Sequence, residues 1–108
     1  MFTRIVECSV KTEKQEELRN KLRSEVVPIL QKQSGFVDEI NLVSDRDPER
    51  MVAISFWRNK EDAERYNRET FPRILDTIKP LLKTTPKVET YNVEDSTVHR
   101  IAAGKAAA

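Results

Sequence analysis

The stretch "MVAISFWRNKEDAERY", Met51–Tyr66, decides the fold because an apolar strand pattern runs directly into a charged helix pattern. Its first eight residues, Met51–Arg58, mix β-branched, aromatic and small side chains, which is typical of a strand. Asn59 then predicts a helix N-cap, and the acidic residues Glu61 and Asp62 suit the positive end of a helix. We therefore expect a strand followed at once by a helix at the centre of the chain.

A strand and a helix are also predicted before this stretch. Phe2–Val10 alternates in the manner of a strand, and Thr12 with Gln15 predicts a capping box at the start of a helix. Pro28 predicts a kink or a restart within that helix, and Gly35 suits the left-handed residue that ends it. One stripe of the helix carries its apolar residues, which are Leu18, Leu22, Val26, Ile29 and Leu30.

The remaining elements complete a familiar order. Phe36–Val43 predicts a strand that forms an antiparallel hairpin with the quoted one, and a new helix is expected to begin near Thr70 and Pro72. Lys87–Val93 predicts the last strand. The order strand, helix, strand, strand, helix, strand indicates an α+β, ferredoxin-like βαββαβ domain over residues 1–96, with a four-stranded antiparallel sheet and both helices on one face.

The quoted strand has apolar side chains on both faces, which indicates that both faces of the sheet are covered. The helices can cover only one of them, and a second copy of the sheet is the simplest cover for the other, so we expect a homodimer. Met51 and Trp57 are expected in that contact between copies. The C-terminal tail, 97–108, is expected to fray or to contact the partner.

Composition excludes several classes of protein. The 108 residues include 19 Lys and Arg against 18 Asp and Glu, a balance that argues against a nucleic-acid binder. The sequence pattern predicts no membrane span and no signal peptide. Cys8 is the only cysteine, which suits a reducing compartment, so a cytoplasmic location is expected. Packing, rather than reactivity, is the expected role of Cys8.

The residues "SGFVDEINLVSD" and "MVAISFWRNKEDAERYNRETF" resemble the antibiotic biosynthesis monooxygenase (ABM) family. Gly35 and Phe36, Trp57, and the run Asn59–Ala63 match family positions in order. The resemblance implies a dimeric α+β barrel built from two ferredoxin-like protomers. In the cofactor-free branch of that family, tryptophan, tyrosine and polar side chains surround an acidic phenol substrate. The strand position where such enzymes carry a polar partner corresponds here to Ala53.

The resemblance makes Trp57 and Tyr66 the first candidates for a site, stacking on a planar substrate at the mouth of a pocket. The alternative is that they form an aromatic corner of the core, because Tyr66 shares a helical stripe with other core positions. Carboxylates in predicted strands are candidates for a general base, and of Glu7, Glu39 and Glu89 we select Glu7. The alternative, which we favour for all three, is that these glutamates face solvent or pair with Lys or Arg at an edge. Tyr66 and Glu7 are thus the candidate catalytic residues, and the candidate substrate-binding residues are Trp57, Phe56, Phe71, Arg73 and Tyr91.

Two functions of different classes fit these residues. The first is a cofactor-independent monooxygenase, an oxidoreductase acting on a small planar oxidisable molecule such as a quinol or a polyketide-like phenol. The second is a non-catalytic dimeric module of the same fold that binds a ligand or serves in stress. No cofactor and no metal site are expected, since His99 is the only histidine and lies beyond the last predicted strand.

Overall fold

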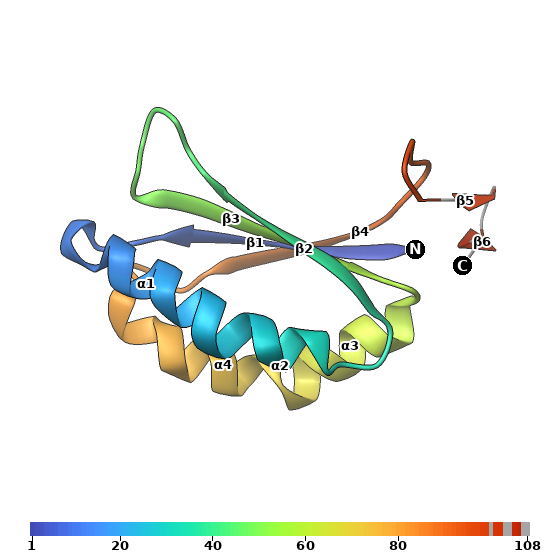
Figure 1. Cartoon of the computed structure of the whole chain (residues 1–108), viewed down its shortest axis with the longest axis horizontal. Coiled ribbons are helices and arrows are strands. Elements are labelled where there is room, and N and C mark those ends of the chain that lie inside the picture. Colours follow the sequence, from blue (N-terminus) through green and yellow to red (C-terminus); the bar gives the residue numbers. More distant parts are fainter. Residues whose placement is uncertain (100, 103–104, 107–108) are drawn as a thin grey trace.

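The computed structural model describes residues 1–99, 101–102 and 105–106. A four-stranded antiparallel sheet forms one layer, and the helices form a second layer on one face of that sheet (Figure 1). This is the expected α+β, ferredoxin-like architecture. The spatial order of the strands is β2-β3-β1-β4, and their bounds are β1 Phe2–Ser9, β2 Phe36–Val43, β3 Arg50–Trp57 and β4 Lys87–Asn92.

The first helical segment, between β1 and β2, changes its winding along its length. It begins with a 3-10 turn, continues as an α-helix, becomes a π-helix at Leu22–Val26 and returns to an α-helix at Val27–Gln31, next to Pro28. The expected restart at the proline is therefore confirmed. The bounds of the helices are α1 Gln15–Lys21, α2 Val27–Gln31, α3 Lys60–Glu69 and α4 Phe71–Ile78, with 3-10 turns at Thr12–Lys14 and Lys79–Leu81. Within the described part of the chain, none of the helices is both long and apolar enough to span a bilayer.

One of the two predicted helix caps forms and the other does not. The Asn59 side chain accepts a hydrogen bond from the Asp62 backbone N–H at 2.9 Å, as expected for an N-cap. The capping box predicted from Thr12 and Gln15 is wrong, because the first turn has no side-chain cap. The Thr12 hydroxyl donates instead to the Glu49 carboxylate, a partner from a distant loop that the local sequence does not reveal.

The helices cover the face of β3 that we expected to contact a second copy. Met51 and Trp57 pack in the core against the chain's own helices, and Trp57 is 0% exposed. The expectation that they contact a second copy is therefore wrong. Both faces of the strand are apolar, so alternation alone does not indicate which face the helices cover.

The opposite face of the sheet carries Val52, Ile54 and Phe56 from β3, together with side chains from its neighbours in register. Ile40 and Leu42 of β2 are 43% and 46% exposed on this face. We call it the outer face. The segment after β4 approaches it through the ring of His99, whose centre lies 6.3 Å from that of Phe56.

The tail includes a short pair of strands, β5 Ile101–Ala102 and β6 Lys105–Ala106, that are hydrogen-bonded to each other. The expectation that the tail frays stays a prediction. The expected contact between the tail and a partner rests on residues of 97–108 that lie partly outside the described residues.

Gly35 fixes the passage from α2 into β2. Its φ angle is +78°, a left-handed conformation that costs any residue with a Cβ atom. Its carbonyl accepts a 2.8 Å hydrogen bond from the Arg58 backbone N–H, and a methyl group at this position would collide with the Asp62 side chain. The turn therefore joins α2, β3 and the start of α3 at a point where only glycine fits.

Replacing Gly35 by alanine is expected to lower the free energy of unfolding by about 2 kcal/mol, from the left-handed backbone and the collision with Asp62. Urea denaturation followed by circular dichroism measures this. Ser34→Ala, at the exposed neighbouring position, is the matched control and is expected to change stability by less than about 0.5 kcal/mol. Equal effects of the two substitutions would contradict the role given to Gly35.

Candidate functional site

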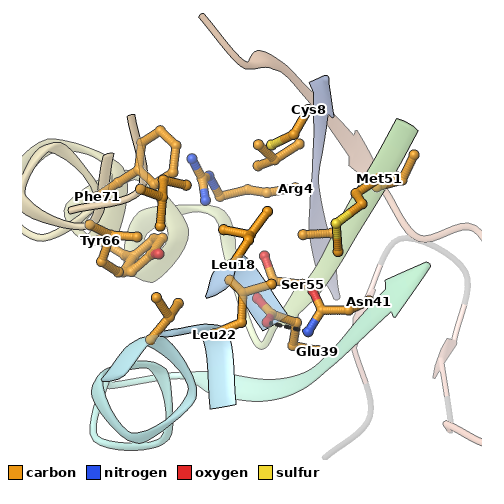
Figure 2. Close-up of a pocket in the computed structure, with 16 residues that line it drawn as sticks. Arg4, Cys8, Leu18, Leu22, Glu39, Asn41, Met51, Ser55, Tyr66 and Phe71 are labelled. Atoms are coloured by element: carbon orange, nitrogen blue, oxygen red, sulfur yellow. Dashed lines mark hydrogen bonds between the residues drawn. The ribbon is translucent and has the colours of Figure 1, made fainter. Parts of the chain in front are cut away.

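A cavity lies between the helix layer and the sheet, and most of its lining is apolar (Figure 2). The cavity volume is about 50 Å³, and the empty space around it is about 600 Å³ when the open mouth is included. Asn41 is exposed while Arg4 and Ser55 are buried, so the cavity opens near β2 and deepens toward β1. Its polar or ionisable lining residues are Arg4, Cys8, Glu39, Asn41, Ser55 and Tyr66.

Strand register places three of these polar groups in one row across the sheet. Ser55 of β3 lies opposite Arg4 of β1 on one side and opposite Glu39 of β2 on the other. Residues paired in this way point to the same face, which here is the face toward the helices. Two strand spacings separate the backbones of Arg4 and Glu39, or about 10 Å. The row thus presents a cation, a hydroxyl and a carboxylate to one cavity.

The next row along the sheet adds an amide. Asn41 of β2 lies opposite Ala53 of β3, and both residues line the cavity. Asn41 Nδ2 donates to Glu39 Oε1 at 3.2 Å, as the dashed line in Figure 2 shows. A carboxamide is therefore present beside Ala53, supplied by the neighbouring strand instead of by β3 itself.

Arg4 is 3% exposed and extends from β1 toward Tyr66 and Phe71 (Figure 2). Its guanidinium carbon lies 5.0 Å from the centre of the Tyr66 ring and 4.6 Å from that of Phe71. Nη2 donates to Asn67 Oδ1 at 2.8 Å. Burial lowers the pKa of Arg4, but an arginine side chain stays charged in proteins, so the cavity holds a positive charge fixed between two aromatic faces.

Glu39 is the carboxylate of the site and is partly buried. Desolvation raises its pKa, while the hydrogen bond from Asn41 and the charge of Arg4 oppose that change. A carboxylate with a raised pKa is a stronger proton acceptor than an ordinary glutamate, which is the property that a general base needs. No ion pair joins Glu39 to Arg4 within 4 Å in the part of the chain that the structure describes.

Tyr66 and Trp57 form an aromatic pair behind the cavity wall. Their ring centres lie 4.9 Å apart, and Trp57 Nε1 donates to Ser55 Oγ at 3.0 Å. Tyr66 lines the cavity, and burial raises its pKa to about 12, although the nearby Arg4 charge opposes the shift. The Tyr66 hydroxyl is therefore protonated at neutral pH and acts as a hydrogen-bond donor, not as a base.

The surroundings of Cys8 limit the reactivity of its thiol. Burial raises the pKa of the Cys8 thiol to about 11, which leaves little thiolate at neutral pH. A packing role for this residue agrees with that environment. Among the residues that the structure describes, no three His, Cys, Asp or Glu side chains gather in a way that could hold a metal ion.

The structure brings together some of the predicted site residues and separates others. Tyr66 and Phe71 line the cavity, whereas Trp57 lies just behind the wall. Glu7 lies on the outer face, opposite Val52 in register, and forms an ion pair with Arg50 at 3.4 Å. The remaining candidates also lie outside the cavity: Phe56 and Tyr91 on the outer face, and Arg73 exposed on α4.

Three polar cavity residues were not among the sequence candidates, namely Arg4, Asn41 and Ser55. Arg4 did carry a signal, because it alternates with the apolar residues Phe2 and Val6 on one face of a predicted strand. An arginine on the buried face of a strand indicates either a paired charge or a binding site. Asn41 and Ser55 carried no such signal, since both are ordinary in strands that reach an edge or a turn.

The ABM family, described as antibiotic biosynthesis monooxygenases, matches residues 1–71, which is more than half of the 108 residues. The chain therefore belongs to the antibiotic biosynthesis monooxygenase family. The matched region includes every strand and helix that contributes Arg4, Glu39, Ser55 and Tyr66. Among curated proteins, no match was found.

Solved structures of similar fold include PA3566 from Pseudomonas aeruginosa, which is 24% identical, with a TM-score of 0.65 and coverage of 83% of this chain and 90% of that one. A conserved protein from Methanosarcina mazei Go1 is 20% identical, with a TM-score of 0.72 and coverage of 84% and 91%. A mutant of SnoaB, a cofactor-independent oxygenase from Streptomyces nogalater, is 16% identical, with a TM-score of 0.75 and coverage of 90% and 96%. At these identities the likeness shows the fold.

The raised pKa of Glu39 has a consequence for stability that can be measured. Because ionisation of Glu39 is less favourable in the folded than in the unfolded chain, its contribution to stability is present at low pH and lost as pH rises. Wild-type protein is therefore expected to lose stability relative to Glu39→Gln as the pH rises above the ordinary pKa of a glutamate. Urea denaturation at a series of pH values measures the difference.

Glu89→Gln is the control, because the opposite change of stability with pH is expected for it. Hydrogen bonds from Tyr91 and Lys87 lower the pKa of Glu89, so wild-type protein is expected to gain stability relative to Glu89→Gln as the pH rises. If the wild type instead gained stability relative to Glu39→Gln as the pH rose, the pKa of Glu39 would not be raised in the folded protein.

Proposed function

We propose that this protein is a cofactor-independent monooxygenase that acts on a small, planar, oxidisable molecule of the quinol or polyketide-phenol type. One observation carries the proposal: a carboxylate with a raised pKa, Glu39, faces an apolar cavity that also holds the fixed charge of Arg4. Membership of the antibiotic biosynthesis monooxygenase family supports the reaction class. The name of SnoaB, a cofactor-independent oxygenase of similar fold, agrees with it.

The proposed reaction begins with a proton transfer. Glu39 accepts the acidic proton of the substrate, and the electron pair of the broken bond stays on the substrate as an enolate or phenolate. This anion reduces molecular oxygen. One oxygen atom enters the substrate and the other leaves as water: the CH2 carbon of an anthrone becomes a carbonyl, whereas a ring C–H of a quinol becomes C–OH as the ring is oxidised to a quinone. In both cases the substrate supplies all the electrons and no cofactor is consumed.

The other cavity residues have roles that follow from their positions. The apolar walls exclude water, which would otherwise solvate the anion and slow its reaction with oxygen. Arg4 stabilises the negative charge as it develops, and the protonated Tyr66 hydroxyl can donate to the same oxygen. Phe71 gives the planar ring a surface on which to stack.

A second candidate is a dimeric ligand-binding module that uses the same cavity without turnover. Ala53 favours it, because this cavity-lining position of β3 offers no polar group of its own. In that case the protein binds planar ligands but consumes no oxygen with them, which separates the two functions in one assay.

Oxygen uptake tests the enzyme proposal. With a panel of quinols and anthrones, wild-type protein is expected to consume oxygen, and Glu39→Gln is expected to lower the rate by about 100-fold or more, as loss of a general base does. Glu7→Gln is the comparison, since Glu7 was the base expected from sequence and lies on the outer face. Loss of activity in Glu7→Gln but not in Glu39→Gln would overturn the assignment, and no uptake with any compound would favour the binding module.

We also propose that the protein is a homodimer that buries the outer face. Ile40 and Leu42 are nearly half exposed there, and Val52, Ile54 and Phe56 continue the same apolar surface across β3. A contiguous apolar sheet face of this kind is typical of a surface that is covered by another molecule. A second copy supplies the same surface about a twofold axis.

Light scattering tests the dimer with a matched pair of substitutions. Ile40→Lys places a charge on the outer face and is expected to shift the protein toward monomer at concentrations where the wild type is dimeric. Ile29→Lys makes the same change at a residue of similar exposure, 37% against 43%, on the helix layer, and is expected to leave the mass unchanged. A wild-type monomer, or equal effects of both substitutions, would contradict the proposal.

A further inference from the structure

The most unusual group in the molecule is the guanidinium of Arg4. It belongs to β1, the strand in which Phe2 and Val6 point to the same buried face, and it is as buried as they are. Arginine is almost never fully buried unless its charge is paired. The position of Arg4 therefore requires an explanation in terms of what its charge contacts.

The contacts within the chain satisfy only part of the guanidinium. Asn67 accepts from Nη2, and the rings of Tyr66 and Phe71 lie against the guanidinium group. The Nε–H is buried and has no acceptor, and Arg4 Nε is the one buried side-chain nitrogen or oxygen atom of the described residues that lacks a partner. Buried polar groups are nearly always hydrogen-bonded, and an exception calls for an explanation such as a catalytic role or a bound water or ion.

The charge is not neutralised from within either. The nearest acidic residue on the same face is Glu39, two strands away, and its carboxylate is not within ion-pair distance. Between the two side chains lies the cavity, with Ser55 at its floor. A cation, an unused donor and an adjoining cavity therefore occur together.

The geometry points to Arg4 as the residue that binds the anionic oxygen of the ligand, so that the cavity takes a flat apolar molecule bearing one anionic oxygen. This deepens the proposed function, on which it rests for the location of the site but not for turnover. The oxygen accepts from Nε–H, and the apolar part of the ligand lies along the side of the cavity formed by Leu18, Leu22 and Ile74. Because the Tyr66 and Phe71 rings hold the guanidinium in place, the donor is oriented before the ligand arrives.

Two kinds of group share this chemistry, an aryl carboxylate and a phenolate or enolate. Both present a negatively charged oxygen on a planar ring and form charge-assisted hydrogen bonds with arginine. The cavity chemistry alone does not distinguish them, so the experiment uses a probe of each kind.

Calorimetric titration of wild-type protein with 2-naphthoate and with its neutral analogue 2-naphthamide tests the carboxylate. We expect 2-naphthoate to bind at least about tenfold more tightly, as a hydrogen bond to a charged group predicts. For the phenolate, we expect bound 4-nitrophenol to ionise at least about one pH unit lower than free 4-nitrophenol, seen as the yellow absorbance of its anion. A preference in either arm supports the proposal and names the group.

Arg4→Met tests the residue itself. Methionine keeps a long apolar side chain in the cavity wall and removes the charge, so the variant is expected to fold, to lose the preference for 2-naphthoate and to leave the ionisation of 4-nitrophenol unshifted. Arg68→Met removes an exposed arginine of α3 and is the control that is expected to keep both preferences.

Equal binding of 2-naphthoate and 2-naphthamide by the wild type, together with no shift for 4-nitrophenol, would overturn the proposal without any variant. A folded Arg4→Met protein that kept either preference would do the same. Anion preference without oxygen uptake would leave this inference standing and remove only the monooxygenase, so the two failures are distinguishable.

Discussion

A positive charge held inside an apolar layer is the constraint on which the rest of this structure depends. Desolvating the Arg4 guanidinium is costly, and the chain offsets that cost with two aromatic faces and one amide oxygen rather than with a carboxylate. These partners come from α3 and α4, so the packing of both helices on the sheet also fixes the charge. What is left over is an unused donor in the wall of an apolar cavity.

The two faces of the sheet serve different purposes. The face toward the helices carries the row Arg4, Ser55 and Glu39. The hydrogen-bonded register of three neighbouring strands fixes the relative positions of these residues. Its outer face continues the apolar surface that we propose a second copy covers. Site geometry and assembly are thus linked through β3, in which alternate residues face the cavity and the proposed partner.

Much of the fold could be predicted from the sequence because local chemistry determines it. The Asn59 cap, the left-handed Gly35 and the helix restart at Pro28 each depend on a few neighbouring residues. Non-local information was missing where predictions failed: the Thr12 hydroxyl bonds to Glu49, and the helices cover the Met51 side of β3. The site needed strand register in the same way, since only pairing through Ser55 brings Glu39 and Arg4 to one cavity and leaves Glu7 on the other face.

The central claim is that the cavity is a binding site organised by the unused donor of Arg4. A crystal structure of the protein grown with 2-naphthoate tests it most directly. The account predicts a carboxylate oxygen within about 2.7–3.2 Å of Arg4 Nε and the naphthalene ring between the sheet and the helices. A naphthoate bound elsewhere on the protein, or a ring in the cavity with its carboxylate directed away from Arg4, would contradict it.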